Sequence, residues 1–333
     1  MEKRLRRFSL LSLCLLNVII AIFCAGELRA EFPDRNITVL VGFAPGAATD
    51  ITARTIALGA EKYLGKKLVI ENKAGGAGSV AASIIANAAP DGYTLCAIPN
   101  VSIMEPALMQ KVTFRPLASF TPIIGHSLAD HTALIVKNDA PWKTFKDFID
   151  YAKKNPGKIK YSSAGVGSGM HMAMETIAHK EGIQWVHVPY KGAAPATTAL
   201  LGGHVDACSA GIGWQVYLKS GDVRALADHG KSRASDYPEV PTLLELGYNF
   251  TNDTIHGILG PAGLPLEIRK KLEEAFTKGM ETPEFKAAQK RLYLTPIYFD
   301  SEAYERHIKE RWVAVEKAMK EAGIITEAAT KPE

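Results

Sequence analysis

The residues from Tyr161 to Gly182, "YSSAGVGSGMHMAMETIAHKEG", combine two patterns that could do chemistry. A short apolar run ends in Ser-Ser-Ala and is followed by three glycines within five residues. A helical pattern then begins, in which His171, Glu175 and His179 are spaced four residues apart. The histidines and glutamate could ligate a metal ion, whereas the glycine-rich turn could hold an anion against backbone N–H groups.

Helix geometry disfavours the metal interpretation. Residues four apart lie on one face of a helix, and two of them can chelate an ion. Three ligands at i, i+4 and i+8, however, extend over about 12 Å at 1.5 Å per residue, so one ion does not reach all three. No H-E-x-x-H pattern is present. We therefore expect no metal site and no cofactor here, and surface or packing roles for these side chains.

The anion interpretation is strengthened by a second connection of the same kind, "GFAPGAATD" at residues 42–50. Both connections follow a short strand-like run and precede a helical pattern. In parallel α/β sheets, ligands bind beyond the carboxyl ends of the strands, where helices begin. The free N–H groups of a helix N-terminus and its dipole favour a carboxylate or a phosphate, and small residues let the anion approach the backbone.

Other catalytic and nucleotide-binding patterns are weak or missing. "GAGSVA" at residues 76–81 fits G-x-G-x-x-A, but the next strand ends in Pro99 and Asn100 without the acidic residue of a dinucleotide site. The sequence contains no phosphate-binding P-loop and no G-x-S-x-G elbow. Cys96 and Cys208 lie in apolar runs, which favours buried free thiols, although the sequence leaves a disulfide open. We expect no catalytic residue.

The N-terminus indicates export. "MEKRLRR" is followed by 19 uncharged residues and by "ELRA", as in a signal peptide cleaved after Ala30, or alternatively after Gly26. A retained membrane anchor is the competing interpretation; a lipoprotein is disfavoured because bulky Phe23 precedes Cys24. Residues 1–30 hold five Lys or Arg against two Glu, which leaves about +1 of the total charge of +4 for the rest. With no later basic run, nucleic acid is not expected as a partner.

Strand-like and helix-like segments alternate along the chain, which predicts an α/β protein with mostly parallel sheets flanked by helices. At 333 residues, two domains are expected. The last third instead contains long amphipathic helical patterns. Strands are expected at 37–43, 67–72, 93–98, 133–137, 158–164, 185–190, 205–210 and 223–228, with helices at 48–65, 79–88, 144–155, from 168 onward and at 194–203.

Eight segments together resemble the periplasmic receptors of tripartite tricarboxylate transporters, often called Bug proteins. The segments occur in the family's order and spacing, and the resemblance covers essentially all of the chain after the signal. They are "PGAATDITAR", "IENKAGGAGSVAA", "PDGYTL", "AKKNPGKIKYSSAGVGSGMH", "VPYKGAAPA", "LLGGHVDA", "PEVPTLLELG" and "GPAGLP".

The resemblance implies a two-lobed, Venus-flytrap binding protein in the periplasm that captures a small organic acid and hands it to a membrane permease. After the signal peptide expected at 1–30, it implies lobe 1 at 31–128 and 254–333 and lobe 2 at 129–253, and we expect a monomer. It also implies that the two helix-start loops hold the ligand's carboxylate, partly through ordered water and without an obligatory arginine. The second loop, "SSAGVGSGMH" at residues 162–171, is therefore interpreted as an uncharged carboxylate cradle.

Ligand-binding residues are expected in both loops and at nearby strand ends. Asp50 and Lys191 are expected to be structural and solvent-exposed, respectively. The predicted ligand-binding residues are Phe43, Ala44, Pro45, Gly46, Ala47, Thr49, Asn100, His131, Ser168, Gly169, His171, Tyr190 and Ser209.

Two departures from the family pattern bear on the ligand. Ala47 stands where the family has a second glycine, and its methyl group slightly narrows the first loop. The run "CSAGIG" at 208–213 is mostly small residues, which suggests room for a longer or aromatic acid. The candidate ligands are di- or tricarboxylates and aromatic carboxylates. A sensor of the same fold that signals through a membrane kinase, and a periplasmic enzyme that uses Cys208 or His171, remain as alternatives.

Overall fold

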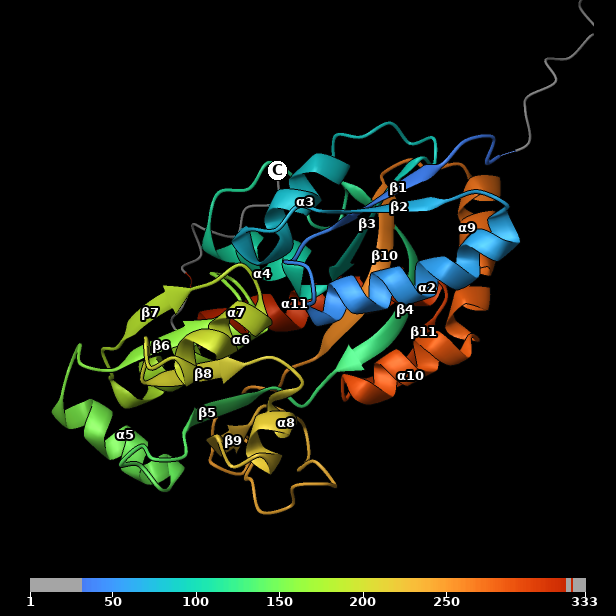
Figure 1. The fold of residues 1–333 in the computed structure, drawn as a ribbon. Helices are drawn as coiled ribbons and strands as arrows, with labels where there is room; N and C mark the ends of the chain where they lie inside the picture. The colour runs from blue at the N-terminus through green and yellow to red at the C-terminus, as the bar shows by residue number, and fades with distance from the viewer. Residues whose placement is uncertain (1–31, 322–324, 326–333) are drawn as a thin grey trace, which may run out of the picture. The chain divides into compact units, whose positions relative to one another are not determined.

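A computed structural model describes residues 32–321 and 325, and its regular elements belong to the compact unit that begins at Arg35. They form two β-sheets with helices packed against them (Figure 1). The predicted signal peptide lies outside the described residues. Among the described helices, none is both long enough and apolar enough to cross a membrane.

The first sheet has six strands in the order β11-β4-β10-β3-β1-β2. Its strands are β1 (Ile37–Val41), β2 (Leu68–Asn72), β3 (Thr94–Pro99), β4 (Phe120–Ala129), β10 (Thr254–Pro261) and β11 (Thr295–Phe299). Its helices are α2 (Ala48–Leu64), η1 (Gly76–Gly78), α3 (Ser79–Ile85), α4 (Val101–Met109), α9 (Leu266–Met280), α10 (Pro283–Arg291) and α11 (Ser301–Glu321).

The second sheet has five strands in the order β7-β6-β8-β5-β9. Its strands are β5 (Ala133–Lys137), β6 (Lys160–Ser163), β7 (Val186–Pro189), β8 (Ala207–Ala210) and β9 (Val223–Asp228). Its helices are α5 (Phe145–Lys154), α6 (Gly169–Glu181), α7 (Ala193–Leu201) and α8 (Trp214–Lys219).

The two-sheet α/β architecture agrees with the sequence prediction, but the sheets are mixed and not mostly parallel. β1 pairs in parallel with β2 and β3, and β6 pairs in parallel with β7 and β8. The remaining pairs, β3-β10, β10-β4, β4-β11, β8-β5 and β5-β9, are antiparallel. The cause is the path of the chain, because β4 leads out of the first sheet and β10 returns into it, so these neighbouring strands run in opposite directions (Figure 1).

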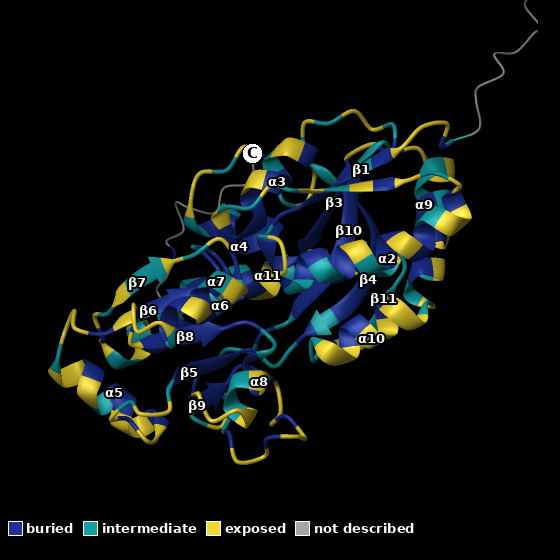
Figure 2. Cartoon of the chain, in the orientation of Figure 1, coloured by how far each residue is buried: buried dark blue, intermediate teal, exposed yellow. Residues whose placement is uncertain are grey.

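The chain passes between the sheets twice. β4 ends at Ala129 and β5 begins at Ala133, and the return segment after β9 enters β10 at Thr254. The lobe boundaries at 128/129 and 253/254 remain a prediction. The sheet interiors are buried and the outer helix faces are exposed (Figure 2). The second sheet packs one apolar cluster on each face, around Phe148 and around Trp214.

Local sequence explains where the key helices begin and end. In α5, Thr144 and Asp147 form a reciprocal capping box. The N-cap of α6 is Ser168, whose side chain accepts the His171 N–H, and α6 ends at Gly182 in the left-handed conformation. The packing of α2 on α9 depends on two glycines, Gly59 and Gly279. A Cβ at Gly279 would lie 2.3 Å from the Ile56 carbonyl oxygen.

Candidate functional site

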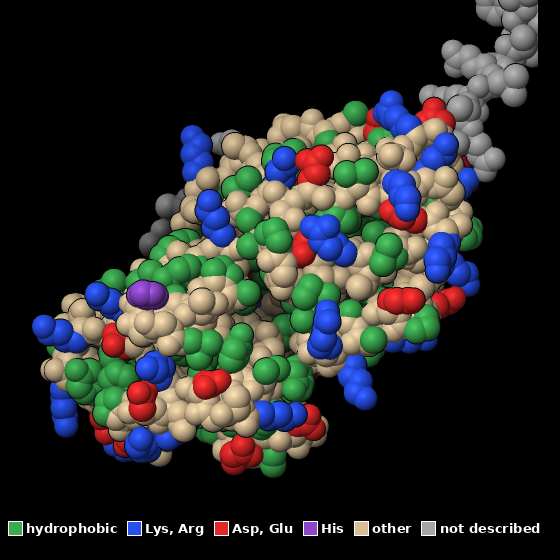
Figure 3. All heavy atoms as spheres, in the orientation of Figure 1, with side chains coloured by type: hydrophobic (Ala, Val, Ile, Leu, Met, Phe, Trp, Pro, Cys, Tyr) green, Lys and Arg blue, Asp and Glu red, His purple; other side chains and the backbone are tan. Residues whose placement is uncertain are grey.

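A cavity of about 190 Å³ lies where helix starts from both sheets converge, and we call it the cleft cavity. Figure 3 shows the surface hollowed on the face where elements of the two sheets meet. The lining residues discussed below come from α2, α4, α6, α7 and α8, from strand ends and from the return segment. Typical drug-sized sites have volumes of roughly 300–1,000 Å³, so this cavity suits a small ligand.

Four helices direct their N-terminal ends at the cleft cavity. α2 contributes Ala48 and Thr49, α4 contributes Val101 and Ser102, α6 contributes Gly169 and Met170, and α7 contributes Ala193 and Ala194. α2 and α7 have no side-chain cap at their N-termini. The first-turn N–H groups of a helix lack intrahelical acceptors, and the dipole places partial positive charge there. The convergence therefore favours a negatively charged ligand group at these helix starts.

The lining contains no Lys, Arg, Asp or Glu among the described residues. Its polar side chains come from Thr49, Ser102, Thr132, Ser168, Thr197, Asn252, Thr254 and His256. Its larger apolar and aromatic members are Phe43, Met170, Ile212, Trp214, Tyr217 and Leu292. The cavity therefore offers neutral donors to an anionic group and an apolar surface to the rest of the ligand.

Hydrogen bonds to Asp50 fix the conformation of the first predicted loop. The carboxylate of Asp50 accepts hydrogen bonds from the Gly46 N–H at 2.9 Å, from Arg54 Nε at 3.0 Å and from Asn72 Nδ2 at 2.8 Å. Burial acts to raise the pKa of Asp50, but these hydrogen bonds outweigh it and leave the pKa below its usual range. Asp50 is absent from the cavity lining, in agreement with the predicted structural role.

The second predicted loop is held by His171. Nδ1 of His171 accepts the Gly167 N–H at 3.2 Å, and the ring stacks on His187 with centroids 4.1 Å apart. Burial lowers the pKa of His171 to about 4, so the ring is neutral at pH 7. His171 does not line the cleft cavity. It supports the loop that presents Ser168 and Gly169.

Six polar lining residues were not predicted from the sequence, and Ser102 and His256 show why; the others are Thr132, Thr197, Asn252 and Thr254. The hydroxyl of Ser102 is buried and has no hydrogen-bond partner, so it is available to a ligand. His256 lies in β10, and its Nδ1 is 3.2 Å from Thr49 Oγ1. Burial lowers the pKa of His256 to about 4, which keeps this ring neutral. Ser102 follows the end of β3, so the strand-end rule could have found it, whereas β10 has no sequence signal that marks His256.

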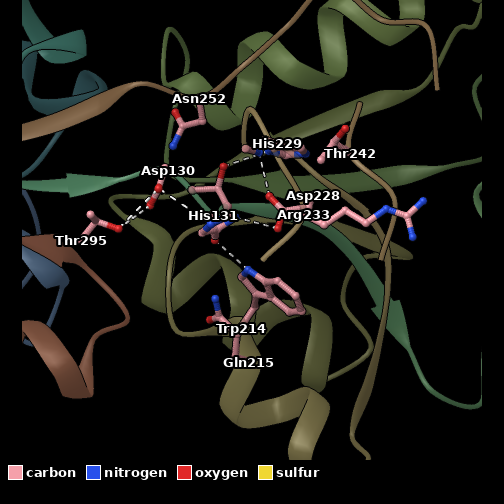
Figure 4. Close-up of polar contacts among 12 residues, drawn as sticks. Asp130, His131, Trp214, Gln215, Asp228, His229, Arg233, Thr242, Asn252 and Thr295 are labelled. Carbon is pink, nitrogen blue, oxygen red and sulfur yellow. Dashed lines mark hydrogen bonds and ion pairs between the residues drawn. The ribbon is translucent and has the colours of Figure 1, made fainter. Parts of the chain in front are cut away.

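The segments between the sheets are held by polar contacts, drawn in Figure 4. His131 Nδ1 lies 2.9 Å from Asp228 Oδ2, and the backbone oxygen of His131 accepts a hydrogen bond from Trp214 Nε1 at 2.9 Å. Asn252 Nδ2 donates to the Ala129 oxygen. His131 itself does not line the cavity, but Trp214 and Asn252 do. The crossing segments thus position two parts of the wall.

The structure brings together only part of the predicted set. The lining includes Phe43, Gly46, Ala47, Thr49, Ser168 and Gly169. It leaves out Ala44, Pro45, Asn100, His131, His171, Tyr190 and Ser209.

The polar members of the second group have other roles. Asn100 caps α4 through its side chain and also accepts the Ile255 N–H at 2.8 Å. Ser209 is fully buried in β8, and Tyr190 packs on the cluster around Trp214. A position at a strand end was therefore not enough to predict a lining residue, because the Asn100 side chain is hydrogen-bonded to backbone groups and the Ser209 side chain is buried in the sheet.

The loops of the two sheets touch beside the cavity. The Ala44 N–H donates to the Lys191 oxygen at 3.4 Å. A Cβ at Gly167 would lie 2.9 Å from the Pro106 backbone, so these segments meet with no room for a side chain. Lys191 itself is exposed and absent from the lining, as predicted.

No cysteine or metal chemistry is visible in the described part of the chain. Cys96 and Cys208 are free and buried, and burial raises the pKa of the Cys208 thiol to about 11, which suppresses the thiolate. No group of three His, Cys, Asp or Glu side chains within residues 32–321 could hold a metal ion.

Comparisons with known proteins agree with this geometry. The model of the tripartite tricarboxylate transporter family receptor matches residues 52–324. The chain belongs to this receptor family. A relative from Cupriavidus necator, "UPF0065 protein in gbd 5'region", is 36% identical over 290 residues, which cover 87% of this chain and 88% of that protein.

Solved structures of receptors show the same fold. The periplasmic binding protein BugD is 30% identical, with a TM-score of 0.81 over 88% of this chain and 99% of that one. MatC from Rhodopseudomonas palustris with bound malate is 27% identical, with a TM-score of 0.79 over 86% of this chain and 99% of that one. Family receptors are periplasmic solute-binding proteins with a two-lobed fold.

Proposed function

We propose that this receptor captures a small organic carboxylate in the cleft cavity and delivers it to a tripartite tricarboxylate-type permease. The observation that carries the proposal is the convergence of four helix N-termini on a cavity without charged side chains. A carboxylate completes the hydrogen bonds of first-turn N–H groups and gains from the dipoles, whereas a cation is repelled. The family's malate-bound member supports the same ligand class.

The lining residues favour, among organic carboxylates, an acid whose carbon skeleton can pack on apolar side chains. Phe43, Trp214 and Leu292 provide surface for carbon atoms, while Ser102 provides an unpartnered hydroxyl. Di- and tricarboxylates and aromatic carboxylates are the candidates. The proposed route is export by the N-terminal signal, capture in the periplasm between the predicted lobes at 31–128 with 254–333 and at 129–253, and release at the permease.

A thermal-shift panel tests the proposal. The mature protein is heated with succinate, malate, citrate, benzoate or nicotinate, and with glucose and putrescine as a neutral and a cationic control. A ligand at one hundred times its Kd stabilises the native state by about 2.7 kcal/mol, which is measurable as a rise in Tm. At least one acid should raise Tm and neither control should. Stabilisation by glucose or putrescine with no response to any acid would overturn the proposal, and turnover of a bound acid would instead identify an enzyme.

A further inference from the structure

A second cavity, of about 320 Å³, lies away from the cleft cavity and shares no lining residue with it. It is lined by residues of α4, α6, α11 and the return segment before β10. The labels of the three helices lie near one another in Figure 1. Its lining consists of Glu105, Met172, Thr176, Asn249, Phe250, Thr251, Arg311, Ala314, Val315, Lys317 and Met319.

Two charged side chains face this second cavity with atoms that have no partner. Glu105 is only 2% exposed, and its buried Oε2 accepts no hydrogen bond. The buried Nε of Arg311 is also unpartnered, although Arg311 Nη2 donates to the Thr251 oxygen at 3.3 Å. No ion pair within 4.0 Å joins Glu105 to Arg311. A buried charged or polar group without a partner is unfavourable, so the arrangement favours a molecule that bridges Glu105 and Arg311.

The charges around Glu105 favour an anion. Burial raises the pKa of Glu105 to about 8, although the charge of Arg311 acts to lower it, so the neutral acid can donate at pH 7. α11 adds Arg311 and Lys317, and the lining residues from α6 (Met172 and Thr176) and from 249–251 are not titratable. The nearby Asp253 and His307 lie 3.9 Å apart and interact with each other. Met172, Phe250 and Met319 supply apolar surface.

We propose that the second cavity is a binding site for a small carboxylate, bridged between Arg311 and Glu105. The carboxylate accepts from the guanidinium Nε–H and from the protonated Glu105, which satisfies both buried groups. The proposal does not rest on the function assigned to the cleft cavity. Occupancy should nevertheless influence the cleft, because α4 and α6 line both cavities: Ser102 and Met170 face one, and Glu105 and Met172 face the other.

Methionine methyl groups report on the two cavities separately. Met170 lines the cleft cavity, whereas Met172 and Met319 line the second cavity. We would label the mature protein with ¹³C-methyl methionine and titrate it with acetate, propionate and benzoate, using sodium chloride of equal ionic strength as the control. The variants are Arg311→Leu, Glu105→Gln and the matched control Arg306→Leu, which removes an exposed cation from the same helix.

At least one acid should shift the methyl resonances of Met172 and Met319 in the wild type and in Arg306→Leu. In Arg311→Leu, the apparent affinity obtained from these shifts should be at least tenfold weaker. Since the pKa of Glu105 is about 8, binding to the wild type should weaken about tenfold between pH 7 and pH 9. Glu105→Gln should bind equally at both pH values. Shifts confined to Met170, shifts equal in the two arginine variants, or shifts no larger than those with chloride would each overturn the proposal and leave a water-filled cavity.

Discussion

His131 donates from Nδ1 to Oδ2 of Asp228 across 2.9 Å, and this pair fastens the first crossing segment to the end of β9 (Figure 4). Asp228 is fully buried, and its other oxygen accepts the Gly230 N–H at 2.7 Å. The hydrogen bond to Asp228 raises the pKa of His131, against an opposing effect of burial. Because the His131 oxygen also accepts from Trp214 Nε1, the pair stabilises both the crossing and a wall of the cleft cavity.

The first prediction follows from the sign of this shift. A histidine with a raised folded-state pKa stabilises fully below the unfolded-state value of about 6.5, and the stabilisation is lost as pH rises through the folded-state pKa. Asp228→Asn should therefore lower the free energy of unfolding by about 1–2 kcal/mol near pH 6, and by less near pH 8.5. Urea denaturation measures this, with Asp139→Asn as an exposed control. An equal loss at both pH values would show that the ion pair is not the cause.

The second prediction concerns how the anion is held. Gly169→Val should weaken ligand binding by at least about tenfold, or 1.4 kcal/mol. A Cβ at Gly169 would lie 2.7 Å from Asn252 Oδ1, so the larger side chain displaces a lining residue and blocks the helix start. Lys191→Ala should change affinity by less than about threefold, because this exposed amine is not in the lining. Isothermal titration with an acid from the thermal-shift panel compares the variants. If Lys191→Ala abolishes binding while Gly169→Val binds normally, a salt bridge holds the ligand.

The sequence could predict the two loops at the starts of α2 and α6, because such loops have a local sequence signature. Glycines and alanines after a strand mark the start of a helix, and in α6 the N-cap Ser168 adds a side-chain cap. Thr49 instead lies in the first turn of α2, whose N-cap Ala47 provides no side-chain cap. His256, Asn252 and Trp214 were not predicted, because they reach the cavity only through the pairing of β10 with β3 and β4 and through α8. Such pairing depends on contacts between residues more than a hundred positions apart, which local patterns do not encode.

The same limit explains the error about the sheets. Strand periodicity located β1, β2 and β3 but carried no information about direction, and β4 and β10 received no strand prediction. "FTPIIGHSLA" contains a proline and a glycine, which weaken a strand pattern. The site prediction also included Asn100 wrongly, because it follows a strand. Its side-chain oxygen instead accepts hydrogen bonds from the N–H groups of Val101 and Ile255.

A third prediction tests the close approach of the second loop to α4. Gly167 has φ +74°, and a Cβ there would lie 2.9 Å from the Pro106 backbone. Gly167→Ala should weaken binding at least fivefold, because the second loop can no longer approach α4, and should cost about 1 kcal/mol of stability from the left-handed conformation. Gly157→Ala is the matched control, since Gly157 has φ +72° and open space around it. Titration and urea denaturation separate the two effects. Equal losses of affinity in both variants would mean that backbone strain, and not the contact with Pro106, is responsible.

The last prediction concerns acid. Burial lowers the pKa of His126, His187 and His229 to about 3 and that of His171 and His256 to about 4. For His126 and His187 a neighbouring histidine adds to the effect. A histidine with a lowered folded-state pKa takes up a proton on unfolding once pH falls below about 6.5, so stability is present above that value and lost below it. Each such group contributes up to about 1.4 kcal/mol per pH unit between pH 6 and pH 4.

The free energy of unfolding should therefore fall steeply from pH 7 to pH 5, and urea titrations at intermediate pH values measure the slope. His229→Gln should reduce the slope by up to about 1.4 kcal/mol per pH unit, because the buried ring can no longer gain a proton. His204→Gln, at an exposed position, is the control and should leave the slope unchanged. If His229→Gln only lowers stability by a constant amount at every pH, then protonation of His229 does not drive acid unfolding, and the loss reflects its contact with Thr132.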